Sequence, residues 1–276
     1  MGTEYKKSPL ILLHGGPGST HNSFELLDEL SDIDERPIIM YDQLGSGKSY
    51  IGDNHKELWN KDTWIKELEN IISYLNIKEC HILGHSWGGM LLIMYLTDTK
   101  REGIKSCILS STLSSASLWG SEAKRLITYM SAKDQKIINN AINSNDYSSK
   151  EFKRSMMNYY HLYVWPKFDK NSPKCLTRKK RKCPEVYETT WGPSEFIPLG
   201  NLKDYDYTLK LKNIDVPVLI LSGANDESTP LQNKIMYDNI VSPKEWYLFQ
   251  NSRHMTYFEE KDNYIKVLKE FIDKHD

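Results

Sequence analysis

The sequence predicts an α/β fold with a mostly parallel β-sheet, helices on both of its faces and an inserted helical cap. Short apolar runs, typical of strands buried on both faces, alternate with stretches whose apolar residues recur at helical spacing. This alternation stops after residue 111 and returns near residue 216. We therefore expect one core made of residues 1–111 and 209–276, interrupted by a helical cap made of residues 112–208.

Six apolar runs are predicted as the strands of this sheet. They cover residues 9–13, 37–41, 80–83, 104–110, 216–223 and 246–249. In the core, helical spacing predicts helices near residues 22–30, 61–75, 90–96, 230–239 and 263–274. In the cap it predicts helices near residues 123–130, 133–143 and 150–163. We expect aromatic side chains of the cap, such as Tyr159, Tyr160 and Trp191, to form a pocket wall.

The composition argues against several classes of partner. The 276-residue chain has 36 lysines and arginines against 37 aspartates and glutamates, so no overall field attracts nucleic acid or an anionic membrane. The first residues lack the apolar stretch of a signal peptide, and no run is long enough to span a membrane. We expect a cytoplasmic protein with reduced thiols, because its four cysteines lack zinc-binding spacing. A disulfide between Cys175 and Cys183 stays open as an alternative.

The segment GHSWGG at residues 84–89 carries the clearest chemical signal. It lies between a predicted strand and a predicted helix, and its Gly84-x-Ser86-x-Gly88 spacing is typical of a nucleophile elbow. On such a sharp turn the serine oxygen is pushed clear of the sheet, while the two glycines let the strand and the helix pass closely. The backbone N–H of Trp87 would then point at an oxyanion beside Ser86.

Two other segments resemble nucleotide-binding or nucleic-acid-binding motifs, but their details argue against such binding. Residues 42–49, DQLGSGKS, end like a phosphate loop, yet that motif needs glycine where this chain has Asp42. We expect a structured turn there instead. The basic run TRKKRK at residues 177–182 lacks interleaved aromatic residues, so we expect a solvated loop rather than a nucleic-acid site.

Asp226 and His254 are predicted to complete a catalytic triad with Ser86. Each follows a predicted strand, and in a parallel sheet the loops at the carboxyl ends of the strands lie together. The chain order Ser, Asp, His is that of the α/β-hydrolases. His254 would take the proton of Ser86 as a general base, while Asp226 would orient the imidazole and stabilise its charged form. The alternatives are a capping role for Asp226 and a surface position for His254. Three other histidines are expected to pack or to form hydrogen bonds, namely His14, His81 and His85.

The loop HGGPG at residues 14–18 follows the first predicted strand. Three glycines and a proline can neither extend that strand nor begin a helix, so we expect a tight loop with an exposed backbone. A tetrahedral oxyanion needs two preorganised N–H donors. We expect one donor from Trp87 and the other from Gly16, with Gly15 as the next choice.

Together these segments resemble the prolyl aminopeptidase (proline iminopeptidase) family of α/β-hydrolases, in its branch with broader N-terminal specificity. The resemblance rests on HGGPG at residues 14–18, YDQLGSGKS at 41–49, GHSWGG at 84–89, WGPSEF at 191–196, GNLKDYD at 200–206, GANDESTP at 223–230 and the loop of His254. It implies the α/β-hydrolase fold with a helical cap. It also implies that Glu195 and Glu227 bind the free amine of the substrate, which is largely protonated at neutral pH. Without the resemblance, both would be interpreted as solvated carboxylates.

We therefore expect a serine aminopeptidase that needs no metal or cofactor and releases N-terminal residues, proline or others, through an acyl-enzyme. Its expected partner is a small peptide with a free N-terminus. We expect no binding to nucleic acid or to a membrane, and the oligomeric state stays open. An esterase or amidase on the same scaffold is the alternative. The intact triad disfavours a hydrolase-fold protein used only for ligand binding or signalling. Serine at position 86 disfavours an epoxide hydrolase or a dehalogenase, which use aspartate there.

Overall fold

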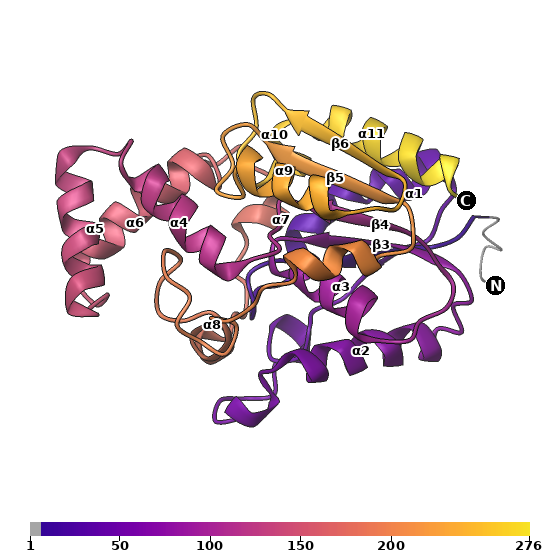
Figure 1. The fold of residues 1–276 in the computed structure, drawn as a ribbon, viewed down its shortest axis with the longest axis horizontal. Coiled ribbons are helices and arrows are strands. Elements are labelled where there is room, and N and C mark those ends of the chain that lie inside the picture. The colour runs from indigo at the N-terminus through magenta and orange to yellow at the C-terminus, as the bar shows by residue number, and fades with distance from the viewer. Residues whose placement is uncertain (1–6) are drawn as a thin grey trace.

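A parallel, six-stranded sheet forms the centre of the computed structural model, which describes residues 7–276 (Figure 1). The strands lie in the order β2-β1-β3-β4-β5-β6 across the sheet. They are β1 (Leu10–Leu13), β2 (Ile38–Met40), β3 (Cys80–His85), β4 (Ile104–Ser110), β5 (Val218–Gly223) and β6 (Lys244–Phe249). Each pairs with its neighbours in parallel and overlaps one of the six predicted runs, so the predicted sheet is confirmed.

Helices cover both faces of this sheet. Along β1, Ile11 and Leu13 belong to one apolar core while Leu10 and Leu12 belong to the other, because successive side chains of a strand point to opposite faces. The first core packs against α2 (Lys61–Tyr74), α3 (Trp87–Asp98), α9 (Pro230–Asn239) and the 3-10 helix η4 (Thr208–Asn213). The second packs against η1 (His21–Leu27), α1 (Glu29–Asp34), α10 (Thr256–Glu259) and α11 (Lys261–Lys274). Two short 3-10 helices, η2 (Gly47–Ser49) and η3 (Lys56–Leu58), follow β2.

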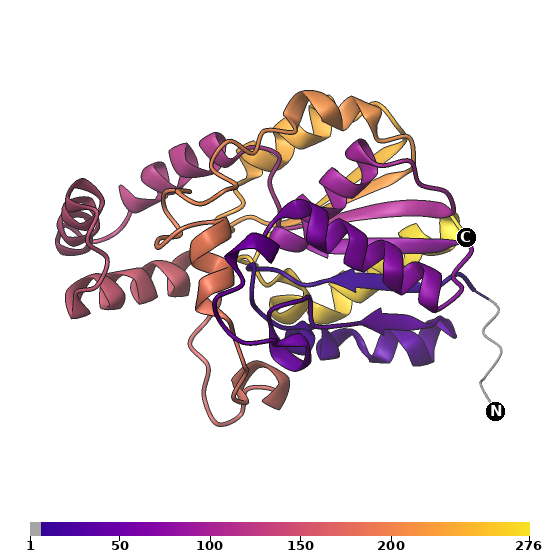
Figure 2. The ribbon, with the colours of Figure 1, turned by 90° about the horizontal axis from the view of Figure 1, so that it is seen from below.

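The chain between β4 and β5 forms an inserted helical region. Its helices are α4 (Ala116–Ile127), α5 (Ala132–Ser144), α6 (Lys150–Tyr163), α7 (Lys174–Thr177) and α8 (Pro184–Thr190). Helices α4, α5 and α6 share a third apolar core, separate from the two cores of the sheet. In Figure 1 these three helices project beyond one end of the sheet, and Figure 2 shows the same arrangement after a quarter turn. The predicted helical insertion is therefore present, whereas the limits 112–208 proposed for a cap stay a prediction.

The cysteine thiols at positions 80, 107, 175 and 183 are free, and all four side chains are buried. Cys175 and Cys183 therefore do not form the disulfide that the sequence left open as an alternative. Within residues 7–276, none of the helices combines the length and the apolar character that crossing a membrane requires.

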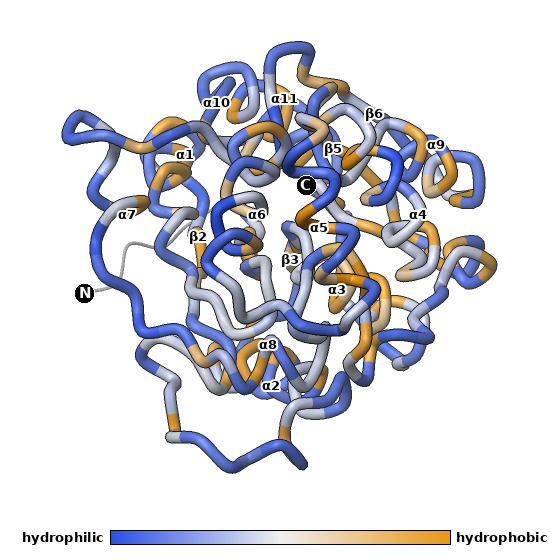
Figure 3. Tube along the Cα trace, turned by 90° about the vertical axis from the view of Figure 1, so that its left-hand side faces the viewer, coloured by the Kyte–Doolittle hydropathy of each residue, from blue (hydrophilic) through white to orange (hydrophobic). Residues whose placement is uncertain are grey.

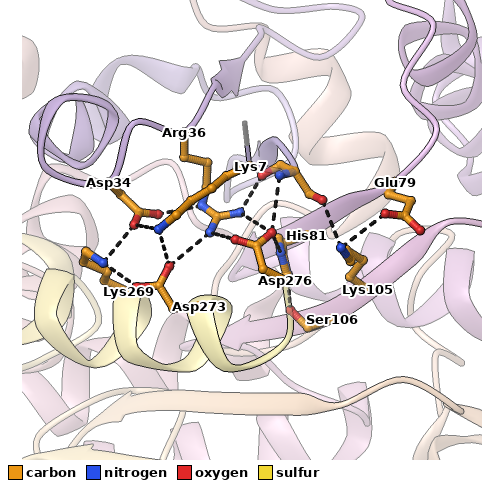
Figure 4. A network of polar contacts seen from close by, with 11 residues as sticks. Lys7, Asp34, Arg36, Glu79, His81, Lys105, Ser106, Lys269, Asp273 and Asp276 are labelled. Atoms are coloured by element: carbon orange, nitrogen blue, oxygen red, sulfur yellow. Dashed lines mark hydrogen bonds and ion pairs between the residues drawn. The ribbon is translucent and has the colours of Figure 1, made fainter. Parts of the chain in front are cut away.

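A buried guanidinium ties the loop before β2 to the end of α11. Arg36 is fully buried, and its Nε donates to Asp34 at 2.7 Å while its Nη2 donates to Asp276 at 2.6 Å (Figure 4). Its Nη1 donates to the carbonyl oxygen of Ser8, just before β1. Burial raises the pKa of Asp276, but hydrogen bonds from Arg36 outweigh that effect and lower the pKa to about 2. Arg36 thus joins three segments that are distant in the sequence.

We expect Arg36→Met to lower the free energy of unfolding by roughly 3–5 kcal/mol, because it removes the buried guanidinium that bridges Asp34 and Asp276 and leaves Asp34 with two partly exposed lysines, Lys7 and Lys269. The matched control is Lys234→Met, which breaks an exposed pair with Asp238 and should cost less than about 1 kcal/mol. The Asp276 carboxylate, whose pKa is lowered to about 2, stabilises the fold above its unfolded pKa of about 3.9 and loses that effect as the pH falls toward 2. The difference between wild type and Arg36→Met should therefore shrink from about pH 4 to pH 2 in urea titrations. Equal effects of the two variants at pH 7 would contradict this account.

Candidate active site

Ser86 occupies a sharp turn between the last residue of β3 and the first residue of α3. Its backbone has φ 55° and ψ −123°, a conformation that residues other than glycine rarely adopt. The flanking glycines are required by close contacts. A Cβ at Gly84 would lie 2.3 Å from the carbonyl oxygen of Gly88, and a Cβ at Gly88 would lie 2.0 Å from that of Leu13. The local geometry is that of the predicted nucleophile elbow.

One cavity gathers nearly all of the predicted site residues. Its volume is about 760 Å³, and it is lined by Ser86, His254, Gly16, Trp87 and Glu227 from the sheet side and by Glu195 from the inserted region. Asp226, the remaining predicted residue, is fully buried behind His254. The structure therefore brings together residues that lie up to 238 positions apart in the sequence, counted from Gly16 to His254.

Asp226 and His254 form the pair that a triad needs. His254 Nδ1 lies 2.7 Å from Asp226 Oδ1, and that oxygen also accepts a hydrogen bond from the backbone N–H of Ser228 at 2.7 Å. Both side chains are buried, and each residue follows the carboxyl end of its strand, β5 or β6. The hydroxyl of Ser86 makes no hydrogen bond with residues 7–276.

Two backbone N–H groups beside Ser86 are unpaired among the described residues. Gly16 and Trp87 both line the cavity, and neither backbone N–H donates to another group of the described residues. The glycine loop lies very close to Ser86, because a Cβ at Gly15 would come within 2.9 Å of the Ser86 Cβ. Trp87 is the first residue of α3, where backbone N–H groups have no partner inside the helix.

Gln43 connects Trp87 with the glycine loop. Its side-chain Oε1 accepts a hydrogen bond from the indole N–H of Trp87 at 2.8 Å. Its Nε2 donates to the carbonyl oxygen of His14 at 3.1 Å, and its backbone N–H donates to His14 Nε2 at 3.0 Å. His14 begins the glycine loop, so one buried glutamine fixes both the loop and the indole of Trp87.

Glu195 and Glu227 are two buried carboxylates that face the cavity without a cationic partner. Among residues 7–276, no lysine or arginine forms an ion pair with either of them, although Glu227 Oε1 lies 4.0 Å from His254 Nε2. Burial raises the pKa of Glu227 well above its usual range, and the charges of Glu195 and Asp226 raise it further. Burial also raises the pKa of Glu195, against a hydrogen bond that it accepts from the hydroxyl of Tyr187. We call these two side chains, which lie beside His254, the anionic site.

The three other histidines of the motifs are buried, as the sequence predicted, and two have clear hydrogen-bond partners. His14 bonds to the backbone of Gln43, and His81 Nδ1 lies 2.7 Å from the hydroxyl of Ser106. His85 instead packs on His254, with ring centroids 4.8 Å apart. Burial lowers the pKa of His14 and of His81 to about 4 and that of His85 well below its usual range, so all three are neutral at pH 7.

Two of the three cap aromatics predicted to form a pocket wall do so. Tyr160 and Trp191 line the cavity, as expected. Tyr159 does not: it lies in the core shared by α4, α5 and α6, with its ring 4.8 Å from that of Phe196. One position along a helix rotates a side chain by about 100°, so neighbouring tyrosines on α6 face different surroundings.

Comparisons with known proteins place this arrangement in a family. A family model described as alpha/beta hydrolase fold matches residues 8–261. The chain is 48% identical to the proline iminopeptidase of Lactobacillus helveticus (strain DPC 4571), over 100% of this chain and 93% of that protein. It is 49% identical to the proline iminopeptidase of Clostridioides difficile (strain 630), over 99% and 92%. The chain belongs to the proline iminopeptidase family of α/β-hydrolases.

A solved structure agrees with this assignment. The crystal structure of proline iminopeptidase from Mycobacterium smegmatis superposes with a TM-score of 0.86 at 27% identity, covering 97% of this chain and 90% of that chain. The family, the fold with its helical insertion and the serine-hydrolase class predicted from the sequence are thereby confirmed.

Other residues of this iminopeptidase-family cavity were not predicted from the sequence. Tyr187, which donates to Glu195, lies on α8, a helix that begins at Pro184 and that the periodicity did not show. Arg178, Lys180 and Lys182 also line the cavity, although their segment was expected to be a solvated loop. Only proline at the first position of α8 could have indicated that helix from the sequence.

Proposed function

We propose that this protein is a serine aminopeptidase that releases N-terminal proline from short peptides, with Ser86 as nucleophile, His254 as base and Asp226 as its orienting carboxylate. The observation that carries the proposal is the pair Glu195 and Glu227, buried beside the base without a cation. A protonated N-terminal proline is a secondary ammonium with two N–H groups, so it can donate one hydrogen bond to each carboxylate. Its positive charge would also favour the ionised form of both glutamates and offset their burial.

The first half of the reaction forms an ester with the enzyme. The oxygen of Ser86 attacks the carbonyl carbon of the N-terminal residue while its proton passes to His254 Nε2. The charge that develops on the carbonyl oxygen is stabilised by the N–H groups of Gly16 and Trp87. His254 then gives the proton to the leaving amine, and the shortened peptide departs. Asp226 stabilises the imidazolium through Nδ1.

The second half releases the amino acid. A water molecule gives its proton to His254 and attacks the acyl carbon, and the same two N–H groups bind the oxyanion. Return of the proton to Ser86 frees proline and restores the enzyme. Because Glu195 and Glu227 hold the amine of the residue that is cleaved, the enzyme cuts one residue from the end of the chain. The cytoplasmic location expected from the sequence stays a prediction.

A panel of aminoacyl p-nitroanilides tests this function. We expect the highest kcat/KM for the prolyl derivative, smaller values for alanyl and leucyl derivatives, and no change on addition of EDTA. Free proline should appear by mass spectrometry after incubation with Pro-Gly-Gly. Failure to cleave any aminoacyl arylamide, with rapid hydrolysis of p-nitrophenyl acetate, would instead support the esterase alternative.

Gln43 is expected to act as a positioning residue for the oxyanion site. We expect Gln43→Met to lower kcat for prolyl p-nitroanilide roughly ten- to a hundredfold with little change in KM, because it releases both Trp87 and the glycine loop. The matched control is Gln135→Met, which removes a glutamine that binds backbone carbonyl groups in the helical insertion. A kcat for Gln43→Met equal to that of the control would remove Gln43 from the catalytic account.

A further inference from the structure

A basic group forms part of the cavity wall. Arg178, Lys180 and Lys182 all line the cavity that holds Ser86, and they belong to the segment between α7 and α8. This segment, residues 178–182, is hydrophilic along its length (Figure 3). We call it the basic segment. The proposed reaction assigns no role to it.

The basic segment is held against the loops that follow β1 and β2. The backbone N–H of Gly47 donates to the carbonyl oxygen of Arg181 at 2.8 Å, and that of Cys183 donates to Gly18 at 3.3 Å. Gly18 packs so closely here that a Cβ would lie 2.7 Å from the carbonyl oxygen of Cys183. The segment therefore has a fixed place beside the glycine loop.

The order of the strands puts the basic segment and the anionic site on opposite sides of the nucleophile. Ser86 follows β3, the loops that hold the basic segment follow β1 and β2, and Glu227 follows β5. In the sheet, β1 and β2 lie on one side of β3, while β4 and β5 lie on the other. A peptide whose amine is bound at Glu227 and whose first carbonyl group meets Ser86 would reach the basic segment if it continued in the same direction.

The two lysines of the segment that line the cavity, Lys180 and Lys182, have no ion pair in residues 7–276. Arg178 forms an ion pair with Glu25, and the guanidinium of Arg181 lies 3.9 Å from the ring centre of Tyr50. Lys180 is half-buried and Lys182 is exposed, and neither makes an ion pair or a hydrogen bond with the described residues. Burial lowers the pKa of Lys180, and the charges of Lys182 and Arg178 lower it further, while Cys175 and Glu25 act in the opposite direction. A substrate carboxylate beside Lys180 would favour its charged form.

We infer that Lys180 and Lys182 bind a carboxylate on the part of the peptide that leaves, which makes short peptides with a free C-terminal carboxylate preferred substrates. The inference rests on the proposed aminopeptidase function. The two ends of a dipeptide or tripeptide would then be bound by side chains of opposite charge. Glu195 and Glu227 would bind its amine, and the two lysines would bind its carboxylate. An aspartate or glutamate side chain in the part of the peptide that leaves would also supply a carboxylate.

The test compares substrates that differ only in this charge. We expect kcat/KM for Pro-Gly and Pro-Gly-Gly to exceed that for the corresponding C-terminal amides by roughly five- to tenfold at low ionic strength, mainly through KM. The difference should shrink in 0.5 M NaCl, since salt screens partly exposed charges. Pro-Asp-NH2 distinguishes the two sources of the carboxylate. If kcat/KM for Pro-Asp-NH2 exceeds that for Pro-Gly-NH2 and the excess depends on the two lysines, the site also binds acidic side chains. If the two values are equal, the site binds only the C-terminal carboxylate.

The double variant Lys180→Met with Lys182→Met should lose the preference for the acid over the amide while retaining its activity on prolyl p-nitroanilide, which has no carboxylate. The matched control is Lys179→Met, because Lys179 is an exposed lysine of the same segment that does not line the cavity. Equal rates on acid and amide in the wild type, or an unchanged preference in the double variant, would overturn the inference. A wild type that fails to cleave prolyl p-nitroanilide would overturn the proposed function itself.

Discussion

Ser86→Ala is expected to reduce kcat on prolyl p-nitroanilide by about four to six orders of magnitude, because it removes the hydroxyl that forms the acyl-enzyme in the proposed reaction. The melting temperature should stay close to that of the wild type. Alanine is as small as serine, so it fits the same tight turn between β3 and α3.

Covalent labelling gives the same variant a second readout. Diisopropyl fluorophosphate should add one phosphoryl group to the wild type, and peptide mapping should locate it on Ser86. The Ser86→Ala protein should stay unlabelled yet still bind Pro-Gly-Gly in calorimetry, since the anionic site is intact. Label on another residue, or normal turnover by purified Ser86→Ala, would remove Ser86 from the mechanism.

Replacing either carboxylate of the anionic site should selectively damage the cleavage of free-amine substrates. We expect Glu195→Gln and Glu227→Gln each to lower kcat/KM on prolyl p-nitroanilide by roughly one to two orders of magnitude. The reason is that a charge-assisted hydrogen bond contributes about 1.5–3 kcal/mol, and 1.4 kcal/mol is about tenfold. Hydrolysis of p-nitrophenyl acetate, which has no amine, should change little.

Two controls separate recognition of the amine from general damage. Glu122→Gln alters a buried glutamate of α4 that pairs with Arg125 and does not line the cavity, so it should leave the ratio of the two activities unchanged. Asp226→Asn should lower both activities together, because it removes the partner of His254. If the Glu195 and Glu227 variants lost ester and arylamide hydrolysis equally, both carboxylates would be structural.

The sheet could be predicted from the sequence because each strand contains a short apolar run, and proline stands directly before β1, β2 and β5. Helices with strong apolar spacing were also found, and α6 and α9 have the predicted limits. Helix α4 begins earlier than predicted, at Ala116, because the hydroxyl of Ser115 caps it by accepting a hydrogen bond from the N–H of Leu118. That capping signal consists of one residue, so apolar periodicity alone did not reveal it.

Within the cavity, the residues that follow strands could be predicted from the sequence, whereas those of the basic segment could not. Ser86, Asp226 and His254 could be placed together because each follows a strand of one parallel sheet, so local pattern and topology sufficed. Lys180 could not, since its position in the cavity wall depends on backbone contacts of its segment with Gly18 and Gly47. Contacts between segments that are distant in sequence leave no periodic pattern, and a run of five basic residues has the composition of a solvated loop.

The central claim is that two buried carboxylates make this hydrolase specific for a free N-terminal amine. Its most direct test is the ratio of wild-type kcat/KM for prolyl p-nitroanilide to that for N-acetylprolyl p-nitroanilide. Acetylation removes the positive charge and adds bulk where Glu195 and Glu227 lie, so we expect a ratio of at least about a hundred. Equal rates on the free and the acetylated substrate would contradict the claim.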